Sequence, residues 1–285
     1  MASLKEIKAR ISSVKSTLKI TQAMKMVASA KLRKAQKMVA GLDAYKSALY
    51  GILDRLQPQI ASLPLLESRG GQVAIIVFSS NTALCGSYNS NLFKGLESRI
   101  KDLAKRDESV VVYPVGEKVA KMARKAGRDV RSDFVAAGDN LAYDDMAAMA
   151  QFFIDGFLEG RISRVELLYM HYYSAARQSI AGRDWLPLRP AKEVSESASG
   201  FDDDYIIEPS ASELLEKLIP LVMRTDMYAT LLSSNASENA CRMIAMQTAS
   251  DNAQDLLSQL QLTYNKQRQQ VITEELTDIS NGKLG

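Results

Sequence analysis

The chain has 285 residues, of which 46% are hydrophobic and 24% charged, and a formal net charge of +3. This is the composition of an ordinary soluble globular protein, and the small net charge excludes a polycation. No stretch approaches about 18 consecutive apolar residues, and the charged N-terminal segment lacks the apolar run of a secretory signal. We therefore expect a protein that is soluble or at most peripheral to a membrane, without direct insertion.

The charges are distributed unevenly along the chain. Residues 1–37 hold ten lysines and arginines against Glu6 alone, whereas residues 196–216 hold seven acidic residues and no cation. Such asymmetry predicts an oriented interaction surface. The two cysteines, Cys85 and Cys241, lie far apart and have no metal-ligand spacing, so we expect reduced, packed thiols in a cytosolic-type compartment.

The first predicted element is one helix over residues 3–57. Apolar or small residues alternate in steps of four and three from Ile7 to Leu42, with Thr21 and Lys25 as the polar members, which is the spacing of a coiled-coil seam. The series then slips by one step, as a stammer would produce. The seam positions predicted after the slip are Tyr45, Leu49, Ile52 and Leu56.

The middle of the chain alternates between runs of β-branched or aromatic residues and helical stretches. Strands are predicted over 72–80, 109–116, 128–138 and 161–175, and helices near 89–106, 117–126 and 140–158. An apolar segment near 183–191 could add an edge strand. This alternation is typical of an open, mostly parallel α/β sheet of the Rossmann-like kind.

The chain ends in a second long helix. A capping box of Ser210 and Glu213 marks its start, only Pro220 interrupts it, and it is predicted to continue to Ser280. Its seam is rich in small residues: Ala236, Ala240, Met243, Met246, Ser250, Ala253, Leu257, Leu260 and Tyr264. We expect the two terminal helices to form an antiparallel coiled coil. The expected segments are an N-terminal helix (1–60), an α/β domain (70–192), an acidic loop (193–209) and a C-terminal helix (210–285).

The common catalytic motifs are missing from the sequence, which has no P-loop, no G-x-G-x-x-G after the first strand, no H-E-x-x-H and no G-x-S-x-G. The turn at 81–91 follows the first strand, where doubly wound sheets bind ligands. A nucleotide or phosphate there is one alternative; a tight turn with a buried cysteine is favoured, because Gly86 supplies only part of an anion cradle. His171 is interpreted as a packed histidine rather than a general base. The acidic groups 144–145 and 202–204 are interpreted as caps and solvated charge, so we predict no metal and no cofactor.

The basic stretch from Ile20 to Gln36 also contains Met24 and Met26. Methionines usually fill packing gaps, and a cationic helix face is usually solvated. Here, however, the two helices are too long for the central domain to cover, which favours a partner for this surface.

Both ends of the chain resemble one family. LKEIKARISSVKSTLKITQAMKMVASAKLRKAQ (4–36) looks like the N-terminal helix of the gamma subunits of rotary F-type ATP synthases, and ASENACRMIAMQTASDNAQDLLSQLQLTYNKQRQQVITEELTDI (236–279) looks like their C-terminal helix. YIIEP (205–209) and the Cys85–Gly86 turn also resemble family segments. The resemblance implies a non-catalytic central-stalk shaft that turns inside a ring of three alpha and three beta subunits, with its foot on the epsilon subunit and the membrane c-ring.

The resemblance also implies roles for individual positions. Met24, Lys25 and Met26 would face an acidic loop of each beta subunit, which gives the uncompensated cations a partner. Broad, weakly directional contacts of this kind would let the shaft rotate past the three equivalent beta subunits of the ring. The positions that match the family's contacts with beta are Met24, Lys25, Met26, Arg242, Arg268, Gln269 and Thr273, and those that match its foot are Tyr205 and Glu208.

One turn departs from the family pattern. NTALCG (81–86) stands where a DRGLCG type of turn is usual, so no detailed role is carried over to it. The lack of a two-cysteine regulatory insertion and of a transit peptide implies a bacterial complex without thiol control. Its expected location is the cytoplasmic face of the plasma membrane, as a peripheral subunit that couples ion (proton) translocation to ATP synthesis or hydrolysis.

Two other functions fit parts of the sequence. A basic coiled coil could lie along RNA phosphates; residues 1–37, however, contain no aromatic residue and only two arginines among ten cations, so nucleic acid is not the expected partner. An enzyme at the edge of the sheet would need a convergent titratable cluster, which the predicted strand ends do not show. Co-purification discriminates between these functions, because a rotor subunit brings stoichiometric protein partners and an RNA arm brings nucleic acid.

Overall fold

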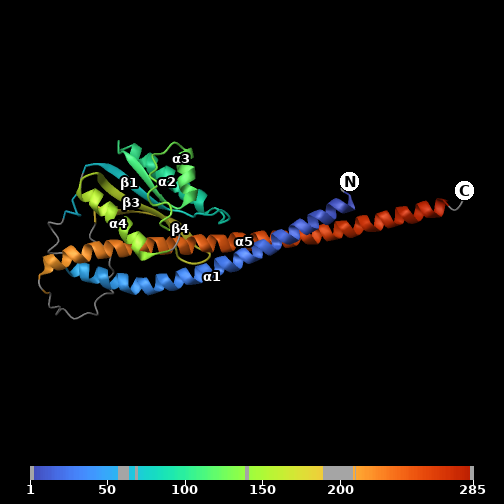
Figure 1. The fold of residues 1–285 in the computed structure, drawn as a ribbon, viewed down its shortest axis with the longest axis horizontal. Coiled ribbons are helices and arrows are strands. Elements are labelled where there is room, and N and C mark those ends of the chain that lie inside the picture. The colour runs from blue at the N-terminus through green and yellow to red at the C-terminus, as the bar shows by residue number, and fades with distance from the viewer. Residues whose placement is uncertain are drawn as a thin grey trace. The chain divides into compact units, whose positions relative to one another are not determined.

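The computed structural model describes residues 3–56, 64–67, 70–138, 141–188, 208 and 210–282 (Figure 1). In chain order the elements are α1 (Leu4–Leu56), β1 (Gln72–Phe78), α2 (Tyr88–Ala104), β2 (Val110–Val115), α3 (Glu117–Lys125), α4 (Tyr143–Leu158), β3 (Ile162–Tyr172), β4 (Gln178–Leu186) and α5 (Ala211–Gly282). The chain divides into two compact units. We call residues 1–30 with 242–285 the helical unit and residues 31–241 the sheet unit.

The helical unit consists of the first part of α1 and the last part of α5, which run in opposite directions (Figure 1). A reciprocal cap starts α1: the Glu6 amide donates to Ser3 Oγ (3.3 Å), and the Glu6 carboxylate accepts from the Ser3 amide (2.9 Å). At the seam, the Ser250 hydroxyl donates to Thr21 Oγ1 over 2.8 Å. The buried seam residues are Ile7, Thr21, Ala28, Met246, Ser250, Ala253 and Leu257. The predicted antiparallel coiled coil is therefore confirmed.

The sheet unit is built on four strands in the order β2-β1-β3-β4. β1 pairs in parallel with both β2 and β3, and β4 pairs antiparallel with β3. Six of the seven residues of β1 are buried, as a central strand covered on both faces requires. The predicted open, mostly parallel α/β sheet is therefore confirmed.

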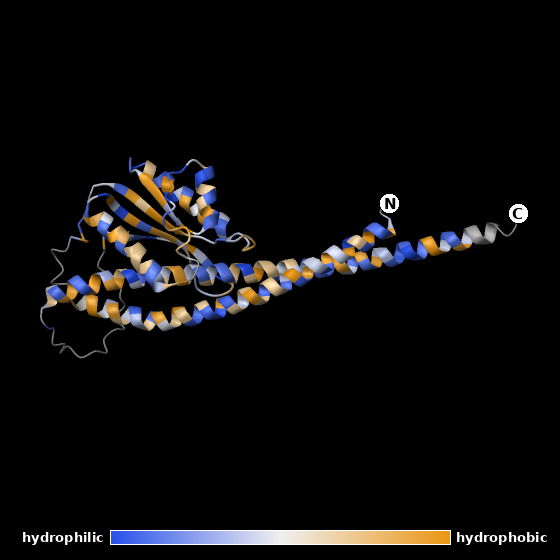
Figure 2. Ribbon diagram, viewed as in Figure 1, coloured by the Kyte–Doolittle hydropathy of each residue, from blue (hydrophilic) through white to orange (hydrophobic). Residues whose placement is uncertain are grey.

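Alternate residues of β1 face two separate apolar cores. Val73, Ile75 and Val77 belong to the core beneath α2 and α3. Ala74, Ile76 and Phe78 belong to a larger core with residues of α1, α4 and α5. Figure 2 shows hydrophobic (orange) and hydrophilic (blue) segments alternating along the strands of the sheet. The period of two along a strand thus produces a three-layer arrangement of helix, sheet and helix.

The predicted strand over 128–138 is wrong. Only Val130 pairs with β2, through a single bridge to Val112, and the chain then forms turns from Asp133 to Gly138. Pro114 lies in β2 and has no amide hydrogen to extend the pairing at this edge. Phe134 instead packs against the ring of Tyr113, with centroids 6.4 Å apart, so aromatic packing replaces a fifth strand.

The edge strand predicted near 183–191 exists, with different bounds. β4 begins at Gln178 and ends at Leu186, and β3 ends at Tyr172, where the prediction extended the strand to 175. The two strands form a hairpin in which His171 pairs with Ser179. The polar residues at the start of β4 hid the strand from an apolar pattern, because an edge strand has one exposed face.

The predicted slip in the seam of α1 is also wrong. Tyr45 and Ile52 are 47% and 38% exposed, whereas Leu49, Leu53 and Leu56 are buried. With half-buried Val39, Leu42 and Lys46, these leucines continue the original alternation of three and four without a stammer. The apparent slip arose because a lysine, Lys46, occupies an inward position of the helix.

Candidate partner-contact surfaces

The first predicted contact group lies on α1 in the helical unit. Met24 and Lys25 are half-buried, and Met26 is 67% exposed. Lys25 follows Thr21 in the seam register, so its position explains its partial burial. Met26 lies outside that register and faces solvent in the isolated chain.

Two neighbouring apolar residues escaped the sequence analysis. Ile20 and Val27 are 59% and 57% exposed, and like Met26 they lie outside the seam register. Large apolar side chains that gather on a surface mark sites of interaction. The sequence could have indicated this exposure, because Ile20 and Val27 lie outside the heptad seam, where an apolar residue does not contribute to the helix pair. The contact group on α1 therefore combines cations with exposed apolar side chains.

The second predicted contact group lies near the end of α5. Arg268, Gln269 and Thr273 are all exposed, and the Thr273 hydroxyl donates to the Gln269 carbonyl within the helix (2.9 Å). The sequence analysis missed four exposed apolar side chains in this region: Leu262 (72%), Val271 (36%), Ile272 (47%) and Leu276 (62%). This end of α5 therefore also presents a mixture of polar and apolar groups.

The two groups lie at different levels of the helical unit. Ser250 of α5 contacts Thr21 of α1, and Thr21 precedes Met24 by three residues. Arg268 lies eighteen residues after Ser250, which is about 27 Å further along α5. Arg242 is half-buried and lies eight residues before Ser250 in α5, or about 12 Å from the level of Ser250. Of the two predicted foot residues, Glu208 is exposed, and Tyr205 lies outside the described residues.

The turn after β1 was the candidate ligand site of the enzyme hypothesis. Its polar side chains bond to one another: the Asn89 amide nitrogen donates to Ser80 Oγ (2.7 Å) and to Cys85 Sγ (3.2 Å). Asn81 Oδ1 accepts from the amide of Glu117, at the start of α3 (2.9 Å). Cys85 is buried, as predicted, and neither it nor Cys241 is in a disulfide. The turn thus ties β1 to the starts of α2 and α3.

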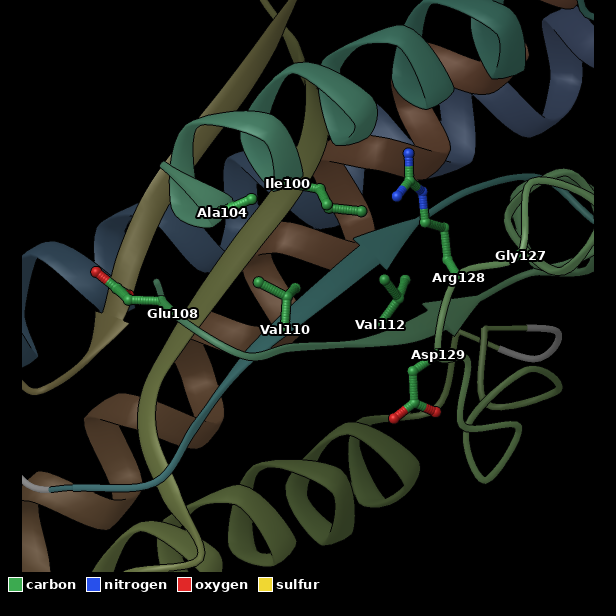
Figure 3. Close-up of a pocket in the computed structure, with 8 residues that line it drawn as sticks. All are labelled: Ile100, Ala104, Glu108, Val110, Val112, Gly127, Arg128 and Asp129. Carbon is green, nitrogen blue, oxygen red and sulfur yellow. The ribbon is translucent and has the colours of Figure 1, made fainter. Parts of the chain in front are cut away.

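A cavity of about 190 Å³ lies at the open edge of β2 (Figure 3). Ile100 and Ala104 of α2 form one wall and Val110 and Val112 of β2 another. Arg128 extends toward α2, where its guanidinium binds both carboxylate oxygens of Glu97 at 2.8 and 2.5 Å. Because this arginine is committed to a carboxylate, we assign the cavity no chemistry.

A cluster of ions around one buried carboxylate joins three elements of the sheet unit. Asp226 of α5, with a side chain only 3% exposed, lies 2.7 Å from Lys46 Nζ of α1 and 2.6 Å from Arg183 of β4. Burial by itself would raise the pKa of the Asp226 carboxyl, but Arg183 and Lys46 outweigh burial and hold that pKa below its ordinary value. Asp226 is therefore ionised at neutral pH.

His171 lies beside this cluster, between the rings of Tyr169 and Tyr173, with centroids 6.0 and 4.5 Å away. Its Nδ1 lies 3.4 Å from Ser233 Oγ. Burial, and then the charges of Lys46 and Arg183, lower the pKa of His171. The half-buried packing agrees with the predicted structural histidine.

The lowered pKa of His171 predicts a pH dependence of stability. The unfolded chain binds a proton with the ordinary pKa near 6.5, more readily than the folded protein. The free energy of unfolding should therefore be highest above about pH 6.5 and should decline as the pH falls toward the lowered folded value. Urea unfolding of wild type and His171→Gln between about pH 7.5 and 5 checks this. The variant should lose less stability over that range, and an equal loss in both proteins would contradict the assignment.

Two further properties concern the described residues only. In that part of the chain, no group of three or more His, Cys, Asp or Glu residues is arranged to hold a metal ion. None of its helices combines the length and the apolar character needed to cross a membrane.

Comparison with known proteins matches residues 3–283 to the family model for ATP synthase. The curated "ATP synthase gamma chain" of Phocaeicola vulgatus is 44% identical over 288 residues, covering 100% of both chains. That of Parabacteroides distasonis is 44% identical over 286 residues, covering 99% of this chain and 98% of the relative.

Solved structures share the fold at lower identity. A chain of the Euglena gracilis mitochondrial ATP synthase rotor has a TM-score of 0.60 at 17% identity, covering 94% of this chain and 98% of that one. A chain from the Tetrahymena thermophila mitochondrial ATP synthase central stalk and c-ring has a TM-score of 0.56 at 22% identity, covering 81% and 99%.

Proposed function

Because the chain belongs to the ATP synthase gamma chain family, we propose that it is the central-stalk rotor subunit of a bacterial F-type ATP synthase. It couples ion translocation through a membrane c-ring to ATP synthesis or hydrolysis on three beta subunits. Full-length similarity to curated gamma chains carries this proposal, and the antiparallel helix pair with exposed apolar and cationic side chains supports it. Its partners are three alpha and three beta subunits, the epsilon subunit and the c-ring, at the cytoplasmic face of the plasma membrane.

The proposed division of labour follows the segments of the chain. In this proposal the shaft is formed by segments 1–60 and 210–285, and the α/β domain by segment 70–192. The acidic segment 193–209 is assigned to the foot, and all of it except Glu208 lies outside the described residues. The seam holds the shaft together, while the side chains outside the seam meet the surrounding subunits. The proposed contacts with beta are Met24, Lys25, Met26, Arg242, Arg268, Gln269 and Thr273; Tyr205 and Glu208 belong to the foot.

The chain has no catalytic site of its own in this proposal. Support comes from the turn after β1, whose Asn81 and Asn89 side chains are committed to structural hydrogen bonds. The isolated chain should therefore hydrolyse no ATP, whereas a mixture with alpha and beta subunits should gain rotation-dependent ATPase activity. ATP turnover by the isolated chain that is lost on substituting Asn81 or Asn89 would overturn the non-catalytic role. A failure to assemble with alpha and beta would overturn the rotor assignment.

The tip residues are expected to matter for coupling more than for folding. Arg268 is exposed, so Arg268→Ala should leave the melting temperature of the chain unchanged. Hydrogen bonds from a charged group contribute about 1.5–3 kcal/mol, and their loss should lower the ATPase activity of the assembled complex. Lys266→Ala, which removes another exposed cation of α5, is the matched control. Normal ATPase activity combined with a destabilised chain would make Arg268 structural.

A further inference from the structure

The starting observation is a lysine at an inward position of α1. Lys46 continues the seam register between Leu42 and Leu49, where the pattern calls for an apolar residue. Its ammonium lies 2.7 Å from Asp226 Oδ1. A charged residue in a seam lowers stability but specifies register, because only one alignment of the helices supplies its partner.

The partner of Lys46 is itself held from a second direction. Asp226 Oδ2 lies 2.6 Å from the Arg183 guanidinium of β4. Arg183 also donates to Thr230 Oγ1 (2.9 Å), and that hydroxyl donates to the Asp226 carbonyl one turn earlier in α5 (2.9 Å). One buried carboxylate therefore connects α1, α5 and the sheet.

Apolar packing is weak where these ion pairs lie. A cavity of about 180 Å³ is lined by Leu42 and Lys46 of α1, by Tyr169 and His171 of β3, and by Ala229 of α5. Polar contacts cross this level: the ion cluster, and a 2.6 Å hydrogen bond from Gln36 of α1 to the Tyr172 hydroxyl of β3. The angular position of α1 here thus depends on directional contacts.

Stability alone does not account for such a cluster. Taking the Asp226 carboxylate out of water costs several kcal/mol, whereas the side chains of Lys46 and Arg183 remain 31% and 33% exposed. Well-packed apolar replacements of such ion groups are often equally stable or more stable. Apolar contacts, however, are non-directional and tolerate small rotations that an ion pair with fixed geometry opposes. The cluster therefore supplies directionality.

We propose that Asp226 is a positioning residue which, through Lys46 and Arg183, fixes the rotational register of α1 and α5 against the sheet within residues 31–241. Torque then passes between the α/β domain and the long helices without slip. The inference rests on the proposed rotor function and assigns to it a residue that is not among the proposed contacts with other subunits.

The decisive variant replaces the cluster by apolar residues of similar size: Lys46→Met, Arg183→Met and Asp226→Leu together. We expect the variant to assemble with an unchanged or higher melting temperature and to hydrolyse ATP. The number of ions pumped per ATP in vesicles should fall at least twofold when pumping works against a membrane potential. The control removes an exposed ion pair at the C-terminal end of α2, through Asp102→Asn with Lys105→Gln, and should pump normally.

A second measurement reads the register directly. Spin labels at the exposed residues Ala48 of α1 and Ser179 of β4, in a background with both native cysteines replaced by alanine, report one distance distribution within the sheet unit. It should be narrow in the wild type and in the conservative variant Lys46→Arg, and broad in the triple variant.

The outcomes separate the two proposals. Normal pumping under load, or an equally narrow distance distribution in the triple variant, overturns the positioning role. Loss of folding or assembly in the triple variant also overturns it, because the cluster would then act through stability. The proposed rotor function fails only if the wild-type chain does not support ATPase activity with alpha and beta.

Discussion

Met24→Lys is expected to uncouple the assembled complex: ATP hydrolysis should persist while ion pumping falls severalfold, more strongly at low salt. Met24 is half-buried on α1 beside Lys25 and exposed Met26. An added cation there would bind an acidic loop of a beta subunit too tightly to release it as the shaft turns. At an effective dielectric constant near 20, a pair of unit charges about 4 Å apart interacts by about 4 kcal/mol before screening, and far less where it is exposed.

Two variants control for other causes. Met24→Leu conserves volume without adding charge and should pump normally. Lys25→Glu removes an attraction to the acidic loops and should assemble, with a change in coupling that also depends on salt. ATPase rate and ion pumping in vesicles are measured for all variants at two ionic strengths. Coupling like that of wild type in Met24→Lys at both salt concentrations would mean that this surface faces solvent in the complex.

Gly116→Ala is expected to lower the free energy of unfolding of the sheet unit by about 2–6 kcal/mol. Gly116 joins β2 to α3 with a φ of +107°, which side chains rarely adopt, and a Cβ there would lie 2.3 Å from the carbonyl oxygen of Ser79. The backbone is held by hydrogen bonds at both residues: the Ser79 amide donates to the Val115 carbonyl (2.7 Å), and the Gly116 amide donates to the Val135 carbonyl (2.9 Å). The backbone therefore cannot move aside cheaply.

Gly127→Ala separates the two causes. Gly127 has a φ of +71°, but a Cβ there meets open space, so only backbone strain of about 1–2 kcal/mol is expected. Urea unfolding of both variants and of wild type measures the difference. Equal losses in the two variants would show that the close approach of Ser79 to Gly116 contributes nothing.

Much of the fold could be predicted because it depends on local periodicity. Steps of three and four locate the seam that contains Thr21 and Ser250, and a period of two within a short apolar run identifies β1 as a central strand. Helix ends could be predicted where a short polar signal marks them: the Ser210 hydroxyl accepts from the Glu213 amide (3.3 Å), as its capping box indicates. The family, too, could be recognised from the helix sequences.

The candidate site could be predicted only in part. The resemblance points to Met24 and Arg268, but the exposure of Ile20 and Leu262 appears only when the seam is assembled and these side chains are left outside it. A pattern of residue types indicates which face of a helix is apolar. The partner helix decides how much of that face is covered.

Pairing across long separations was decided by the tertiary structure. Phe134 joins an aromatic cluster instead of extending an edge strand, and the hairpin partner of β3 begins in polar sequence at Gln178. Lys46 seemed to interrupt the seam because its counter-charge, Asp226, lies 180 residues away in the chain. The periodicity of a sequence indicates which face of one helix or strand is apolar. Whether a buried charge has a counter-charge depends on which elements pack together, and that is decided only when the chain folds.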